Sequence, residues 1–286
     1  MPQDDAAFAS FERKWLEANP EQATVAIFLA PAERRRTAAF GSLVHELEQA
    51  TFGVREAQVA AVKLNWWRQE LVAAATGTSR HPIARELFDD EQTRAIHPAF
   101  WSNLIDGALA QLDVGAASAL DDSILALAAF YRPVASLETA LAGDDATQDA
   151  ANARLWISSH LLHSVAAQPE HERAIPLGLL ARHGLTRSAL AEPGAQRSAL
   201  LRDYLGLVQA EIEDALARAP RASLGRRVRA RLDRELAAKA REAADPAAML
   251  TEHPGRRRWR GLWLSWREAR RLARNDVLTK IGRAHV

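Results

Sequence analysis

The chain has 286 residues, no cysteine, a hydrophobic content of 48% and a net charge of +1. The absence of cysteine excludes disulfides, thiolate catalysis and cysteine-ligated metal, while the length is sufficient for a sizeable core. No apolar run approaches the roughly 20 residues that span a bilayer, and the first five residues are acidic where a leader segment would be basic. We therefore expect a cytoplasmic protein, with peripheral contact to a membrane surface left open.

Charge is unevenly divided between the two halves of the chain. Residues 1–150 carry a net charge of −10, and residues 151–286 carry +11. Such asymmetry indicates two differently charged surfaces rather than a uniformly basic nucleic-acid binder. We expect no nucleic-acid partner.

Apolar residues recur at spacings of three and four through almost every long segment, which predicts helices. The predicted helices span residues 5–18, 33–50, 55–76, 98–112, 121–142, 147–167, 197–218, 222–243 and 256–276. Prolines lie mainly at the breaks between them. Asp121-Asp122 and Asp144-Asp145 are expected at helix starts, where carboxylates complement the helix dipole. With no strand pattern and no repeat, the prediction is one all-α domain over residues 1–279.

Residues 280–286 are predicted to be a non-native tail. Residues 281–286 read Ile-Gly-Arg-Ala-His-Val, which the codons of a common sequencing-adapter string encode, and Lys280 fits a codon running into it. We leave this tail out of the functional reasoning.

Two adjacent tryptophans, Trp66 and Trp67, lie inside the predicted helix 55–76, followed at once by Arg68. Neighbouring helical side chains point about 100° apart, so the two rings cannot share one face. We expect one ring to pack into the core and the other to border a cavity or a neighbouring helix. Two ordinary core aromatics are the simpler interpretation.

Several short sequence motifs follow the tryptophan pair along the chain. Gly77 and His81-Pro82 come first, then Tyr131-Arg132-Pro133-Val134-Ala135, and then Ile175-Pro176-Leu177 with residues 179–185. In order and spacing, the set resembles the squalene/phytoene synthase family, the head-to-head prenyltransferases. The resemblance covers roughly residues 25–275.

This resemblance implies an all-α bundle of the type I isoprenoid synthase fold around a central cavity. In the family, two aspartate-rich helices face each other there and hold Mg²⁺, which binds the substrate diphosphates. Mg²⁺ requires several oxygen ligands at about 2.0–2.1 Å, and aspartates at i and i+4 place two carboxylates on one helical face. Mg²⁺ is thus the expected cofactor if the chain is active, and no cofactor is expected otherwise.

The chain departs from the family at both aspartate motifs. At the first, His45, Glu46 and Gln49 occupy the positions of acidic ligands, and Glu48 adds a second carboxylate only if it turns inward. Glu46 is the candidate metal ligand that remains. Histidine is a poor substitute for these ligands, because Mg²⁺ prefers oxygen.

At the second motif, Ser159 and His163 occupy matching positions, and no acidic residue lies between Asp149 and Glu170. A transition-metal site between His45, His160 and His163 is conceivable but is not demanded by their spacing. No catalytic residue is assigned. The candidates for a substrate pocket are His45, Glu46, Gln49, Trp67, Arg68, Tyr131, Ser159 and His163.

The segment 256–274 combines tryptophans with arginines. Trp259, Trp263 and Trp266 fall on one helical face at i, i+4 and i+7, among eight arginines. Core packing with a solvated basic rim is one interpretation. A basic amphipathic helix that rests its tryptophans on anionic lipid is another, and nucleic-acid binding is a third.

Two functions remain at this point. The favoured one is a non-catalytic family member that acts as a lipid- or isoprenoid-binding or assembly protein. The alternative is an active Mg²⁺-dependent prenyltransferase with divergent ligands, which joins two prenyl diphosphates. The missing carboxylates favour the first, because a diphosphate would be poorly compensated in a low-dielectric cavity.

Overall fold

The computed structural model describes the backbone of residues 2–143, 146–251 and 258–283, and these residues contain helices but no strand. The elements are α1 (Pro2–Ala18), α2 (Glu21–Val25), η1 (Ala26–Phe28), α3 (Pro31–Phe52), α4 (Ala57–Ala75), α5 (Pro82–Asp89), α6 (Glu91–Arg94), α7 (Pro98–Ala110), α8 (Leu120–Ala142), η2 (Ala146–Gln148), α9 (Asp149–Ala167), α10 (Leu177–Arg182), η3 (Ser188–Ala191), α11 (Ala195–Arg218), α12 (Leu224–Glu242), α13 (Pro246–Thr251) and α14 (Arg258–Arg283).

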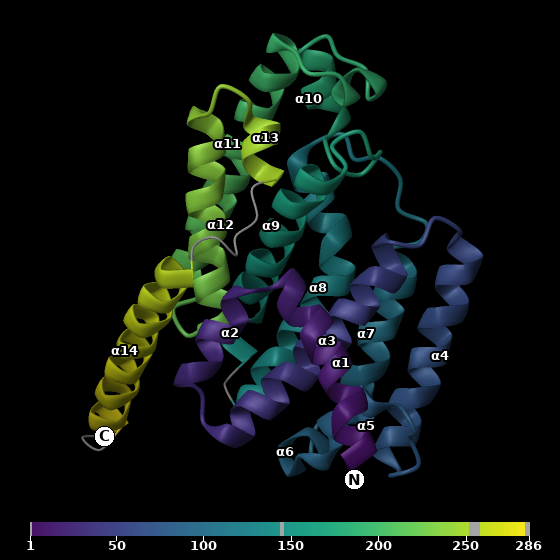
Figure 1. The fold of residues 1–286 in the computed structure, drawn as a ribbon, viewed down its shortest axis with the longest axis vertical. Coiled ribbons are helices and arrows are strands. Elements are labelled where there is room, and N and C mark those ends of the chain that lie inside the picture. Colours follow the sequence, from purple (N-terminus) through teal and green to yellow (C-terminus); the bar gives the residue numbers. More distant parts are fainter. Residues whose placement is uncertain (1, 144–145, 252–257, 284–286) are drawn as a thin grey trace.

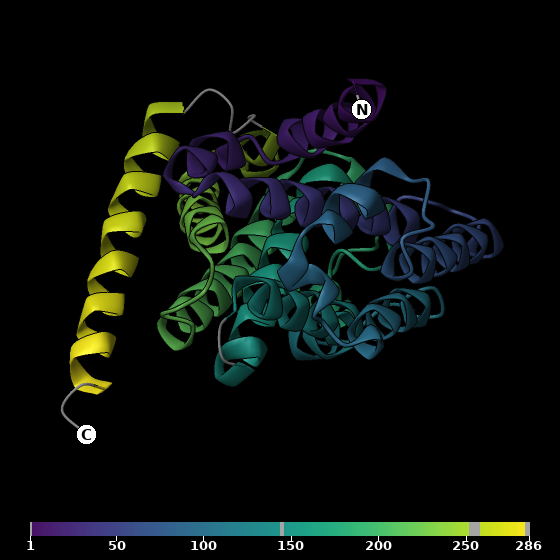
Figure 2. The same ribbon diagram turned by 90° about the horizontal axis from the view of Figure 1, so that it is seen from below.

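The helices form one bundle with α8 and α9 near its middle (Figure 1). Helices α9, α11 and α12 pack against one another on one side of α8, while α7 and α4 follow on the other. α3 packs on α1 and α5 and also contacts α8. α14 lies along one edge of the molecule, against α2 and α12 (Figure 2). The predicted all-α bundle is confirmed.

All nine predicted helices are present, and apart from the C-terminal end of α14 their ends lie within a few residues of the predicted positions. Five short helices were not predicted, namely α2, α5, α6, α10 and α13. α14 also continues seven residues beyond the predicted end of its helix. The predicted helix start at Asp144-Asp145, residues 256–257 and residues 284–286 lie outside the described residues.

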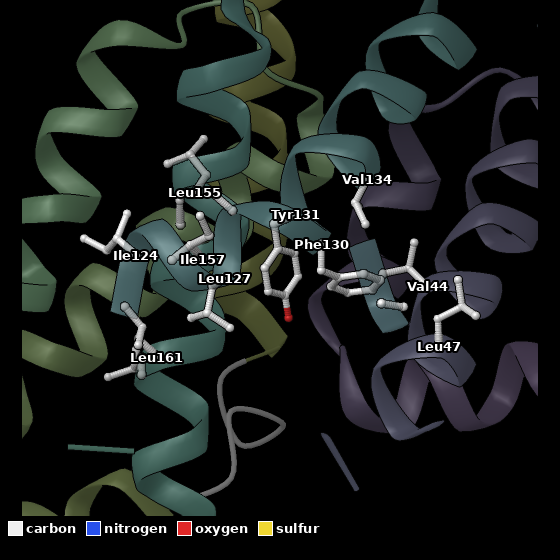
Figure 3. Close-up of a cluster of buried hydrophobic side chains, with 14 of the residues drawn as sticks. Val44, Leu47, Ile124, Leu127, Phe130, Tyr131, Val134, Leu155, Ile157 and Leu161 are labelled. Carbon is white, nitrogen blue, oxygen red and sulfur yellow. The ribbon is translucent and has the colours of Figure 1, made fainter. Parts of the chain in front are cut away.

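The core is built from aliphatic side chains around the aromatic pair Phe130 and Tyr131 of α8, both fully buried. Figure 3 shows these rings between Val44 and Leu47 of α3 and the leucines and isoleucines of α8 and α9. α7 approaches α8 closely at Gly107, where a Cβ would collide with the Ala129 carbonyl. This contact requires glycine, since any side chain would force the two helices apart.

α8 is also long and apolar enough to cross a membrane by length and composition, contrary to the expectation that no apolar run reaches that length. Within the bundle, 56% of its apolar window is buried by neighbouring helices. The composition of α8 therefore matches that of a central core helix.

The tryptophans of α4 and those of α14 differ in their exposure to solvent. In α4, Trp67 packs into the core with 4% of its surface exposed, whereas Trp66 is 43% exposed. In α14, Trp259, Trp263 and Trp266 all face solvent. The interpretation of the α14 tryptophans as core residues is therefore wrong, because the face of α14 that packs on the bundle carries Gly261, Leu264, Ser265 and Glu268.

Candidate functional site

Glu48, Tyr131 and His160 join α3, α8 and α9 in the middle of the bundle. The Tyr131 hydroxyl donates to Glu48 Oε1 at 2.8 Å and lies 2.9 Å from His160 Nδ1. A tyrosine has one proton, so donation to Glu48 leaves the hydroxyl oxygen to accept from His160, whose Nδ1 then carries hydrogen. Phe52 covers the imidazole, with 4.3 Å between the ring centroids.

Burial shifts the pKa of each member of this trio toward its uncharged form. Burial raises the pKa of Glu48, against the hydrogen bond from Tyr131 and the positive charges of Arg226 and Arg229. Burial and the neighbouring Glu48 raise the pKa of Tyr131 well above its usual value. Burial lowers the pKa of His160 to about 4, so the imidazole is neutral at physiological pH.

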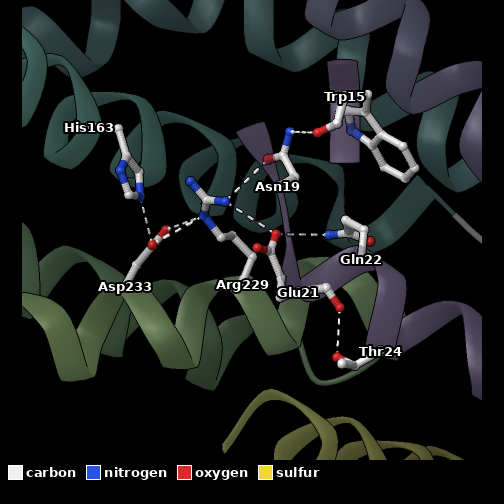
Figure 4. Close-up of polar contacts among 8 residues, drawn as sticks. All are labelled: Trp15, Asn19, Glu21, Gln22, Thr24, His163, Arg229 and Asp233. Atoms are coloured by element: carbon white, nitrogen blue, oxygen red, sulfur yellow. Dashed lines mark hydrogen bonds and ion pairs between the residues drawn. The ribbon is translucent and has the colours of Figure 1, made fainter. Parts of the chain in front are cut away.

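A second polar cluster is centred on Asp233 and Arg229 of α12 (Figure 4). Asp233 Oδ1 lies 2.8 Å from His163 Nε2 of α9 and 3.1 Å from Arg229 Nε. Ser159 also hydrogen-bonds Asp233. On its far side, Arg229 donates to Glu21 Oε1 at 3.1 Å and to Asn19 at 3.2 Å. The cluster therefore ties α9 and α12 to the N-terminal segment.

The charges of this cluster compensate one another. Burial alone would raise the pKa of Asp233, but Arg229 and His163 hold that pKa well below its ordinary value. Burial alone would lower the pKa of Arg229, but Asp233 and Glu21 raise it above its ordinary value. Asp233 is thus a carboxylate that a cation, an imidazole and the Ser159 side chain already engage.

A third group lies where α8, α9 and α12 meet. Glu138 accepts from Trp156 Nε1 at 2.8 Å and from Ser223 Oγ at 2.7 Å. The Arg226 guanidinium stacks on the Trp156 ring, 3.1 Å from its centroid. Arg226 is buried, its Nε has no hydrogen-bond partner among the described residues, and burial lowers its pKa.

These groups surround a pocket of about 50 Å³ between α1, α3 and α12. A cavity of this size holds roughly three or four water molecules. Its walls include the charged or polar side chains of His45, Glu48, Glu138, Arg226 and Arg229. The pocket is therefore small, polar and flanked by two guanidinium groups.

The side chains of the predicted first metal motif on α3 point in different directions. His45 lines the pocket, and burial lowers its pKa. Glu46 points to the side of α1, where its Oε1 lies 3.7 Å from Lys14 Nζ, and Gln49 is exposed. Glu48 is the acidic side chain of this helix that turns inward.

The other residues predicted to line a substrate pocket lie in two separate parts of the bundle. Tyr131, Ser159 and His163 belong to the polar clusters in the bundle. Trp67 and Arg68 lie on α4 and do not line the pocket. Trp67 packs its ring 4.5 Å from that of His81, and Arg68 pairs with Asp106 at 2.6 Å.

Five charged residues of these clusters were not among the residues predicted from the sequence. They are Glu21, Glu138, Arg226, Arg229 and Asp233. One signal was present, because Arg229 and Asp233 have the i,i+4 spacing of a helical ion pair. That spacing is common on solvated helices and does not by itself indicate a site.

The Mg²⁺ site that the resemblance implies can be tested against these side chains. Glu48, Glu138 and Asp233 each accept hydrogen bonds from neighbouring side chains, and two guanidinium groups lie among them. In the part of the chain that the structure describes, no three histidine or acidic side chains are arranged to hold a metal ion. The residues present therefore do not fit a magnesium diphosphate cluster, which needs converging oxygens around each ion.

No family model matches this chain, and no curated protein matches it. Solved structures do. A dehydrosqualene synthase in complex with a ligand superposes with a TM-score of 0.68 and 14% identity, over 95% of this chain and 98% of the other. The squalene synthase HpnC from Alicyclobacillus acidocaldarius gives 0.62 and 13%, over 87% and 94%. The chain therefore has the helical isoprenoid synthase fold of these squalene synthase structures.

Proposed function

We propose that this protein is a non-catalytic relative of the squalene and phytoene synthases, which acts as a lipid- or isoprenoid-binding or assembly protein in the cytoplasm. The observation that carries the proposal is the engagement of Glu48 and Asp233. Each faces the middle of the bundle, and each is already hydrogen-bonded to a neighbouring side chain.

Energetics support this proposal. Freeing Asp233 for a metal would leave Arg229 and His163 without their shared carboxylate, and breaking such a buried pair costs about 3–5 kcal/mol. Freeing Glu48 would also deprive Tyr131 and His160 of their hydrogen-bond chain. Both costs oppose the assembly of Mg²⁺ on these helices.

The size of the pocket opposes both catalysis on two prenyl chains and the binding of one isoprenoid chain at this place, and so favours the assembly role within the proposal. Pockets that enclose organic ligands typically measure about 300–1,000 Å³, far more than the roughly 50 Å³ between α1, α3 and α12. A prenyl chain could enter there only after the lining side chains, Trp156 and Arg226 among them, had moved apart.

The alternative function is an active head-to-head prenyltransferase with divergent ligands. Two observations favour it, namely the likeness of the fold to squalene synthase structures and the inward position of Glu48. In this alternative, Glu48 would leave Tyr131 and bind Mg²⁺ when a diphosphate enters.

Calorimetric titration with farnesyl thiodiphosphate, which resists ionisation, separates the two functions. We expect any binding to be the same with and without Mg²⁺. Mg²⁺-dependent binding that Glu48→Gln weakens at least tenfold, while Glu46→Gln leaves it unchanged, would overturn the proposal in favour of the alternative. Glu46 is the matched control because it lies on the same helix and points toward Lys14.

A further inference from the structure

α14 is attached to the bundle by one face only. Gly261, Leu264, Ser265 and Glu268 are buried on that face. Ser265 Oγ lies 3.1 Å from Thr24 Oγ1, and Glu268 Oε2 accepts from Arg227 Nε at 2.9 Å. These contacts fix the rotation of the helix, so its opposite face is held toward solvent (Figure 2).

That opposite face carries a stripe of tryptophans. Trp259, Trp263 and Trp266 are 85%, 42% and 45% exposed, and their spacing places them along one line. Such a contiguous band of large apolar rings is unusual on a protein surface unless another surface covers it.

Guanidinium groups lie directly beside these rings. Arg260 and Arg267 lie 4.6 and 4.5 Å from the Trp263 ring centroid, and Arg270 lies 5.0 Å from that of Trp266. Arg271 and Arg274 join Trp266, Arg267 and Arg270 around an open groove of about 390 Å³.

Little acidic charge reaches this face within residues 258–274, where Arg267 Nη2 lies 3.6 Å from Glu268 Oε1. The one acidic residue of that stretch, Glu268, is buried on the inner face against Arg227 and Arg231. Arg260 pairs with Glu235 of α12, but the arginines at 270, 271 and 274 project beyond the bundle. The outer face is therefore cationic and aromatic together.

We propose that this outer face of α14 docks on an anionic phospholipid bilayer. Tryptophan rings favour the headgroup region, where one edge of the ring is apolar and the other is wet. Arginines at the same depth bind lipid phosphates, and each basic side chain near such a surface contributes about 1 kcal/mol, or roughly fivefold in affinity. The surface is separate from the central pocket, so this proposal does not depend on the one above.

Co-sedimentation with sucrose-loaded vesicles tests the proposal, using phosphatidylcholine alone and an equal mixture with phosphatidylglycerol. We expect the full chain to sediment with the anionic vesicles and much less with the neutral ones, and binding to weaken as salt rises. The triple variant Arg270→Gln, Arg271→Gln, Arg274→Gln should bind at least tenfold more weakly. Replacing the same three arginines by lysine should largely preserve binding.

Two control variants accompany these changes, and the first matches the arginine-to-glutamine variant in number and charge. Arg55→Gln, Arg80→Gln, Arg182→Gln removes three exposed arginines elsewhere and should leave binding unchanged. Trp66→Ser removes an exposed tryptophan of α4 and should also leave it unchanged, whereas Trp259→Ser, Trp263→Ser, Trp266→Ser should abolish it.

Equal binding to neutral and anionic vesicles, or equal losses in the control variants, would overturn the proposal. So would binding of the outer face to an oligonucleotide in preference to anionic vesicles. Cooperative thermal unfolding of each variant shows that a loss of binding comes from the surface and not from unfolding.

Discussion

Tyr131 of α8 and Glu48 of α3 are joined by a hydrogen bond of 2.8 Å in the middle of the bundle. The same hydroxyl meets His160 of α9, so one oxygen atom links three helices. This arrangement gives Glu48, the carboxylate of α3 that turns inward, a structural partner in the middle of the bundle.

Replacing Tyr131 by phenylalanine removes the hydroxyl and leaves Glu48 and His160 without their shared partner. We expect the free energy of unfolding to fall by about 2–3 kcal/mol, because unsatisfied buried polar groups are costly. Urea denaturation measures the change. Tyr204→Phe is the matched control, since Tyr204 is equally buried and donates to the Leu161 carbonyl at 3.1 Å. A larger loss in the Tyr204 variant would contradict the importance of the Tyr131 link.

Asp233→Asn should destabilise the protein by about 3–5 kcal/mol at neutral pH, because it breaks a buried ion pair with Arg229. Asp106→Asn breaks an exposed pair with Arg68 and should cost less than about 1 kcal/mol. The pKa of Asp233 is depressed in the folded protein, so its stabilisation is present above the ordinary value of 3.8 and is lost as pH falls through the folded value. The difference between wild type and Asp233→Asn should therefore shrink in strong acid.

The lowered pKa of His160 predicts that the folded protein loses stability in mild acid. Its pKa falls from 6.5 to about 4 on folding, so between these values the unfolded chain binds a proton that the folded protein does not. Stability should decrease as pH falls through this window, by at most about 3 kcal/mol from this residue. In His160→Asn the slope of unfolding free energy against pH should be shallower. Identical slopes would show that His160 does not titrate as described.

Gly107 marks the closest approach of α7 and α8. Gly107→Ala should cost about 1–3 kcal/mol, because the added methyl group collides with the Ala129 carbonyl. Gly115→Ala meets no atom within 4 Å and should leave thermal stability unchanged or raise it slightly. A Gly107→Ala protein as stable as Gly115→Ala would mean that the helices separate without cost.

Much of the fold could be predicted from the sequence. Long helices bury one face, so the three- and four-residue apolar spacing and the prolines between segments located all nine of them. Helices α5, α10 and α13 have eight residues or fewer, too short for that periodicity to develop.

The site was harder to predict, because its geometry depends on which way single side chains turn. Glu46 and Glu48 lie two residues apart on α3, and the one aligned with a family ligand points to Lys14 while the other turns inward. The partner of His163 is Asp233, 70 residues later on α12, and no local pattern connects them. For Trp259, Trp263 and Trp266, the spacing showed a shared face but not whether that face is buried or exposed.

Pyrophosphate release from farnesyl and geranylgeranyl diphosphate in the presence of Mg²⁺ tests the central claim most directly. The measurement uses protein in excess over substrate, so that even a single slow turnover is detected. The engaged positions of Glu48 and Asp233 predict no release above the rate without protein. Release that requires Mg²⁺, yields a head-to-head C30 or C40 product and disappears in Glu48→Gln would contradict the account.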